Sequence, residues 1–81
     1  MTVSAQISVY PLRQERLTPT IAAVSQALQE VGLEPEVGPM STIVTGDAGT
    51  VFRALEAAFA RAASTAHVVM TVAVSNACPI G

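Results

Sequence analysis

The stretch PEVGPMSTIVTG, from Pro35 to Gly46, decides the fold because it places two short strands next to each other in mid-chain. Glycine and proline punctuate a chain strongly, so Gly38-Pro39 predicts a turn between strands at 34–37 and 41–45. The triplet Met40-Ser41-Thr42 follows this turn directly. It can hold a catalytic nucleophile, form a ligand-binding strand edge, or simply start a strand.

An amphipathic helix is expected on each side of this stretch. Upstream, Thr18 is the predicted cap, and Gly32 suits the helix end because glycine adopts positive φ without penalty. The apolar stripe of this first helix is Ile21, Val24, Leu28 and Val31. Downstream, Asp47 is the predicted cap of the second helix. Its stripe is Val51, Leu55, Ala58, Phe59 and Ala62.

The two ends of the chain alternate between apolar and small polar residues, as half-buried strands do. These strands are expected at 3–10 and 67–76. The resulting order, β-α-β-β-α-β, predicts an α+β, ferredoxin-like domain over residues 1–81. Right-handed crossovers give a four-stranded antiparallel sheet in the order 4-1-3-2, with both helices on one face.

Composition narrows the classes of partner. The 81 residues include 51% apolar and only 12% charged residues, and the net charge is −2. This balance argues against nucleic acid and anionic membranes, which attract clustered Lys and Arg. No apolar run is long enough for a transmembrane span, and the first residues lack a signal-peptide pattern. Cys78 is the only cysteine, so no internal disulfide is expected and cytoplasmic residence is the simplest interpretation.

The sheet face away from the helices is predicted to be almost uncharged. Its expected members are Ser4, Gln6, Ser8, Tyr10, Ser41, Ile43, Thr45, Val69, Thr71, Ala73 and Ser75. A solvated face usually carries Lys and Glu. Another copy of the chain is therefore expected to cover much of this face, as a dimer or tetramer.

Catalytic side chains are scarce. The single histidine, His67, and Cys78 are placed at opposite ends of the last strand, too far apart for a nucleophile-base pair. No carboxylate pair, metal-ligand cluster or phosphate-binding loop is present. We therefore expect no catalytic residue, no metal and no enzyme. Hydroxyl and amide side chains on strand edges remain, and they suit binding of a small polar heterocycle.

Four segments resemble a known family. They are SAQISVYPL, VGPMSTIVTGD, VFRALEAAFARA and HVVMTVAVSNACP, and the resemblance runs from about Ser4 to Pro79. They are similar to the YkoF-like proteins, which bind thiamine or hydroxymethylpyrimidine. The resemblance implies a ferredoxin-like ligand carrier or sensor that assembles through sheets and strand edges. The positions that match its motifs, with one neighbour, are Ser8, Tyr10, Ser41, Thr42, Cys78 and Asn76.

Three functions therefore stay open. The first is binding of thiamine or its pyrimidine precursor as a ligand, without a further cofactor, with Tyr10 available to stack under the thiazolium. The second is a small phosphatase that would use Arg13 or Arg16 for an anion and Asn76 for water. The predicted strand order places Asn76 and these arginines at opposite sheet edges, which disfavours it. The third is an oligomerisation or regulatory module without its own ligand.

Overall fold

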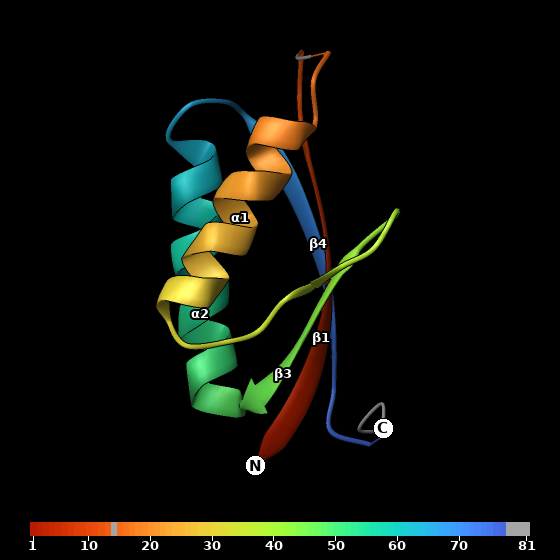
Figure 1. Cartoon of the computed structure of the whole chain (residues 1–81), viewed down its shortest axis with the longest axis vertical. Helices are drawn as coiled ribbons and strands as arrows, with labels where there is room; N and C mark the ends of the chain where they lie inside the picture. Colours follow the sequence, from red (N-terminus) through yellow and green to blue (C-terminus); the bar gives the residue numbers. More distant parts are fainter. Residues whose placement is uncertain (14, 78–81) are drawn as a thin grey trace.

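The computed structural model describes residues 1–13 and 15–77 and has the expected order of elements (Figure 1). The elements are β1 (Thr2–Pro11), α1 (Thr18–Glu30), β2 (Glu36–Val37), β3 (Thr42–Asp47), α2 (Ala48–Ala63) and β4 (Val68–Ser75). In this part of the chain no helix is both long and apolar enough to cross a membrane.

The strands form one antiparallel sheet in the order β2-β3-β1-β4, which is the predicted order counted from the other edge. Both helices lie on the same face of the sheet (Figure 1). Ile7 in β1 lies opposite Thr42 in β3 and Val72 in β4. The ferredoxin-like fold expected from the sequence is therefore confirmed.

The core lies between this sheet and the helices. Alternate residues of β1 supply its floor, namely Val3, Ala5 and Ile7, and all three are buried. Both helices supply its roof through Val24, Ala27, Leu28, Val51, Ala54, Leu55, Ala58 and Ala62. Burying a Val or Leu side chain contributes about 1.5–3 kcal/mol. Most of the second predicted stripe and the middle of the first thus hold the layers together.

The two helix ends next to glycine and aspartate form as predicted. Gly32 has φ +97°, and the backbone N–H of Leu33 then donates to the carbonyl of Leu28 over 3.1 Å. At the start of α2, the carboxylate of Asp47 accepts from the backbone N–H of Gly49 over 3.1 Å. Each contact satisfies a backbone group that a helix end leaves free.

Three expectations about the helices are wrong. Val31 does not belong to the core stripe, because it follows α1 as its C-cap and its side chain is 37% exposed. Thr18 does not cap α1: it is the first helical residue, and the cap position is Leu17, whose side chain makes no capping bond. Phe59 does not belong to the core, because its side chain is 44% exposed. Ala54 takes that place in the stripe. Phe59 lies on a flank of α2, where a large apolar residue fits the helical period without being covered.

The helices are also joined at their surface. The guanidinium of Arg61 in α2 donates two hydrogen bonds to the carboxylate of Glu30 in α1, at 2.6 and 2.8 Å. This hydrogen bonding and the charge of Arg61 hold the pKa of Glu30 below its usual value. The pair therefore shows which flank of α2 faces α1.

Candidate functional site: a groove where β1 and β3 separate

The sheet opens at one end of β1. The ladder between β1 and β3 ends at Ile7 and Thr42, whereas β1 continues to Pro11 against β4 alone. The β2–β3 hairpin swings away from β1 at this point (Figure 1). Its tip is tight, because the backbone N–H of Gly38 donates to the carbonyl of Ser41 over 2.8 Å. The divergence leaves a space beside the free edge of β1.

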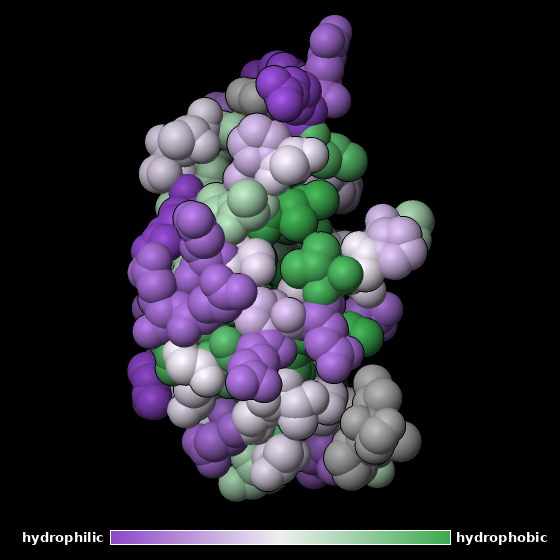
Figure 2. Space-filling view, viewed as in Figure 1, coloured by the Kyte–Doolittle hydropathy of each residue, from purple (hydrophilic) through white to green (hydrophobic). Residues whose placement is uncertain are grey.

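A groove of about 320 Å³ occupies this space. Its apolar wall comes from both strands, the hairpin and the start of α1, through Ile7, Val9, Leu17, Ile21, Val37 and Met40. Apolar side chains gather between α1 and the hairpin in Figure 2. Small-molecule sites begin at about 300 Å³ and combine apolar walls with a few polar groups. The groove therefore fits a single small heterocycle.

Four hydroxyl side chains line the same groove, and they are Ser8, Tyr10, Ser41 and Thr42. The Ser8 hydroxyl donates to the backbone carbonyl of Met40 over 3.3 Å. The Ser41 hydroxyl accepts from the amide of Gln6 over 3.2 Å. Both contacts lie on the sheet face away from the helices. The two hydroxyls therefore already make one hydrogen bond each, which holds the hairpin beside β1.

Ser41 and Thr42 do not point to the same side. Thr42 lies opposite the buried Ile7, is only 6% exposed, and therefore faces the helices. Ser41 lies on the other face, beside Gln6. Successive residues of a strand alternate between faces. The groove nevertheless contacts both hydroxyls, because it lies where the β1–β3 ladder ends and both faces of the sheet border the same space.

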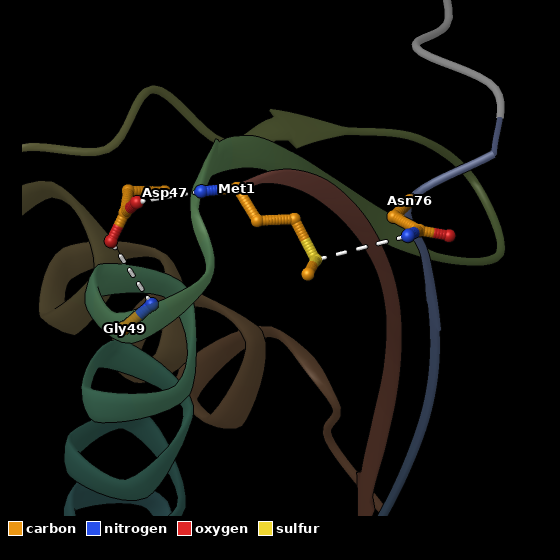
Figure 3. Close-up of polar contacts among 4 residues, drawn as sticks. All are labelled: Met1, Asp47, Gly49 and Asn76. Carbon is orange, nitrogen blue, oxygen red and sulfur yellow. Dashed lines mark hydrogen bonds and ion pairs between the residues drawn. The ribbon is translucent and has the colours of Figure 1, made fainter.

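Asn76 lies elsewhere. It follows β4 and borders a small cavity of about 160 Å³ with Thr2, Val3, Ser4 and Ser75, toward the opposite end of β1. Its side-chain amide lies 3.8 Å from the sulfur of Met1 (Figure 3). The predicted set of six thus divides: four members line the groove, Asn76 does not, and Cys78 lies outside the described residues.

An ion pair joins the start of β1 to the end of β3, near the cavity that Asn76 borders. The amine of Met1 lies 3.4 Å from the carboxylate of Asp47, which also caps α2 (Figure 3). The amine, and then the backbone N–H of Gly49, hold the pKa of Asp47 below its usual range. Asp47 is therefore occupied in structural contacts, as the predicted cap should be.

The groove itself carries no ionisable acid, base or cation suited to catalysis near neutral pH among its described lining residues. Ser41 has no histidine, carboxylate or lysine beside it in that lining to act as a base. In residues 1–13 and 15–77 no group of His, Cys, Asp and Glu side chains could hold a metal ion. The arrangement can donate and accept hydrogen bonds and enclose an apolar ring.

Sequence reasoning missed the apolar half of the site. Ile21 was assigned to the core stripe, yet it is only half-buried and lines the groove. Leu17 and Val37 received no site role, and both remain exposed at the rim. Their positions beside the ends of α1 and β2 could have indicated this role, because no helix or strand in the described part of the chain packs over apolar side chains there.

Comparison with known proteins agrees with the fold. The model of the YKOF-related family matches residues 2–81. No curated protein sequence matches the chain. A solved structure from Streptococcus pneumoniae is 28% identical over 99% of this chain and 90% of its own, with a TM-score of 0.85.

Two further structures share the fold at lower identity. A hypothetical protein of Methanocaldococcus jannaschii is 18% identical over 99% of this chain and 84% of its own, with a TM-score of 0.86. A Thermotoga maritima protein provisionally assigned to thiamine biosynthesis or salvage is 22% identical over 93% of this chain and 83% of its own, with a TM-score of 0.82.

Proposed function

The chain belongs to the YkoF-related family, and from this premise we propose that its groove binds thiamine or the hydroxymethylpyrimidine half of thiamine without chemical conversion. The observation that carries the proposal is the meeting of Ser8, Tyr10, Ser41 and Thr42 around one apolar groove of about 320 Å³. The provisional assignment of the Thermotoga maritima neighbour to thiamine biosynthesis or salvage supports the same ligand class.

The chemistry of the pyrimidine suits this lining. An aminopyrimidine is a flat apolar ring whose edge carries ring-nitrogen acceptors and an amino donor. Hydroxyl side chains both donate and accept, so they can match either kind of group. The side chains of Leu17, Ile21 and Val37 can cover the ring faces. The neutral ring gains from burial here and leaves no charge unpaired.

The thiazolium half of thiamine would lie at the rim. Tyr10 lines the groove and is 46% exposed, so its ring can stack on a cation that remains partly in water. Such a contact is worth roughly 0.5–2 kcal/mol. No cationic side chain belongs to the described lining to receive a phosphate. Thiamine and hydroxymethylpyrimidine are therefore better ligands than their phosphate esters.

The lining residues described for the groove, which include no catalytic group, support a carrier, salvage or sensing role. Hydrolysis or group transfer needs a base, an activated nucleophile or a metal. The groove supplies positioning alone, so we propose that the protein is not an enzyme. The role suits the cytoplasm, where we expect the protein to act.

We also propose that the protein assembles with itself, starting at the β4 edge. A long flat edge without charge or proline invites pairing with another strand. β4 has the sequence VVMTVAVS, without any of these protective residues, and it forms one edge of the sheet. The other edge, β2, is two residues long and carries Glu36. β4 is thus the edge that a second copy would extend.

The helix layer supports the same edge. Phe52 and Arg61 are nine positions apart, which at about 100° per residue places them on opposite flanks of α2. Arg61 faces α1, so Phe52 and Phe59 face away from it, toward β4. Phe52, Phe59, Val72 and Val74 are 56%, 44%, 38% and 39% exposed. A second copy paired at β4 would cover this apolar strip.

The sheet face away from the helices is the second proposed contact, and it carries more charge than the sequence predicted, because Glu36 lies opposite Ile43 and Asp47 opposite Thr2. The pairing of β1, β3 and β4 places the predicted side chains there, and Ser41, which precedes β3, joins them through its contact with Gln6. Ser4 and Thr45 already share a hydrogen bond of 3.0 Å there. Two edge-paired dimers meeting on this face would form a tetramer. An oligomerisation module without a ligand is the second candidate function, because this surface supports it equally well.

The decisive experiment is isothermal titration of the purified protein with thiamine and with hydroxymethylpyrimidine. The proposal expects saturable binding of both, weakened in Ser41→Ala and retained in Ser75→Ala. Ser75 is the matched control, since it is a strand serine outside the groove. No heat with either ligand, from protein shown by mass spectrometry to be ligand-free, would reject the binding function and favour the oligomerisation module.

A further inference from the structure

The backbone groups of β1 alternate between its two neighbours. The backbone N–H of Leu12 donates to the carbonyl of His67, on the β4 side, over 2.7 Å. The carbonyl of Met1 accepts from Ala48, on the β3 side, over 2.8 Å. In an antiparallel sheet, alternate residues bond to opposite neighbours. The backbone N–H and C=O groups of even-numbered residues in β1 therefore point toward β4, and those of odd-numbered residues point toward β3.

Val9 is the first odd-numbered residue beyond the end of the ladder with β3. The register would place Met40 opposite it, two positions past the pair of Ile7 and Thr42. The described residues show no backbone hydrogen bond between Val9 and Met40. The Met40 carbonyl instead accepts from the hydroxyl of Ser8. The N–H and C=O of Val9 thus face the groove that Val9 itself lines.

Buried or half-buried backbone groups need partners. We propose that the backbone of Val9 reads the amino edge of the pyrimidine: its N–H donates to a ring nitrogen, and its C=O accepts from the neighbouring amino group. The inference rests on the proposed function and adds the group that sets its specificity. The ligand would take the place of the missing rung between Val9 and Met40.

These two hydrogen bonds to Val9 predict which pyrimidines bind weakly. In a 4-aminopyrimidine, a ring acceptor stands next to an amino donor. In the 4-oxo ring, a ring N–H donor stands next to an oxygen acceptor, so both positions are reversed. A site built to hydrogen-bond a ligand rejects an analogue that leaves those groups unpaired. The groove should therefore discriminate by hydrogen-bond pattern between two rings of almost equal size.

An added peptide strand is a weaker occupant of the same edge. Strand addition requires a row of free backbone donors and acceptors. Beyond Val9 the next odd-numbered residue is Pro11, which has no backbone N–H. The free edge thus offers one complete donor-acceptor pair, which suits a single heterocycle better than an extended chain.

The first arm of the test leaves the protein unchanged. Wild-type protein is titrated with hydroxymethylpyrimidine, with its 4-oxo analogue, and with the analogue that lacks only the 2-methyl group. We expect the 4-oxo ring to bind roughly tenfold or more weakly and the demethylated ring to keep most of its affinity. Equal binding of the amino and oxo rings would overturn the role of Val9 while leaving pyrimidine binding intact.

The second arm removes the donor. Val9→Pro deletes the N–H that points away from β4, so the β1–β4 ladder keeps its bonds, and a strand accepts proline at such a position. We expect binding to be lost in Val9→Pro and only partly weakened in Val9→Ala, which shortens a groove-lining side chain but keeps the N–H, with unchanged circular dichroism in both variants. Wild-type affinity in folded Val9→Pro would reject the inference. Failure of wild-type protein to bind any pyrimidine would reject the proposed function, and the inference with it.

Discussion

The Ser8 hydroxyl donates a hydrogen bond to the Met40 carbonyl over 3.3 Å, across the point at which β1 and β3 part. This side chain holds the hairpin beside β1 where no backbone rung does so. The groove lies at this point, because a regular ladder between β1 and β3 would have filled the space. The local loss of sheet pairing is therefore the feature that creates the candidate site.

Ser8→Ala should weaken pyrimidine binding more than it weakens the fold. The substitution removes one partly exposed hydrogen bond, so we expect a Tm within about 3 °C of the wild type. Affinity should fall several-fold, because the hairpin is no longer held at its present distance from β1. Isothermal titration and thermal unfolding measure the two effects. A large loss of Tm with unchanged affinity would contradict this role.

Met40 is expected to act as a ligand contact at the surface. It is 86% exposed at the hairpin tip, yet it also lines the groove. Met40→Ala should leave the Tm unchanged and reduce affinity for hydroxymethylpyrimidine by about threefold to tenfold, since a flexible apolar cover is removed. Val31→Ala, another exposed apolar truncation, is the control because Val31 lies outside the groove.

Charge at the β4 edge should break self-association. Val74→Lys places a cation within the apolar strip and beside the free strand edge. We expect the proposed oligomer, measured for the wild type in analytical ultracentrifugation, to dissociate to smaller species in this variant. Glu36→Lys at the short β2 edge should leave the edge-paired dimer intact. Dissociation by the β2 variant alone would show that the other edge pairs.

The two glycines Gly32 and Gly49 should respond differently to alanine. Gly32 has φ +97°, where an L-residue is strained, so Gly32→Ala should lower the free energy of unfolding by about 1–2 kcal/mol. Gly49 lies in the first turn of α2 without positive φ, where alanine gains helix propensity but its Cβ would meet Oδ2 of Asp47 at 3.3 Å; these two effects oppose each other, so its substitution should change stability by less than about 0.5 kcal/mol. Urea unfolding compares them. Equal losses would contradict the conformational explanation.

The Glu30–Arg61 pair should make stability depend on acid pH. Its hydrogen bonds hold the pKa of folded Glu30 below the ordinary 4.5, so the unfolded chain binds this proton first as pH falls. The pair therefore stabilises the fold above pH 4.5 and loses its effect as pH falls through the folded pKa. Arg61→Met should return the pKa of Glu30 toward 4.5, as NMR titration can measure. An unchanged Glu30 titration would contradict the assignment.

The layers of the fold were predictable because each rests on a local pattern. Alternation in β1, the glycine at position 32 and the cap at Asp47 all appear in the structure as the sequence indicates. The prediction that Phe59 is buried was wrong, because helical spacing shows which face of a helix is apolar but not how far the sheet extends beneath that face. The lateral end of the core depends on tertiary packing.

The site was only partly predictable for a related reason. Ser8, Tyr10, Ser41 and Thr42 meet at the groove, but the opposite directions of Ser41 and Thr42 follow from the register with Ile7. The free backbone of Val9 depends on where the ladder stops, and no side-chain pattern encodes that point. Asn76 was grouped with the others by its place in a sequence motif, whereas distance along β1 separates it from them.

The most direct test of the central claim is chemical-shift mapping by 15N NMR during titration with hydroxymethylpyrimidine. We predict saturable shifts confined to the groove, led by the amide of Val9, whose proton should move downfield as it gains an acceptor. Shifts around Ser75 and Asn76, at the other end of β1, or no shifts at all at saturating ligand, would contradict the account.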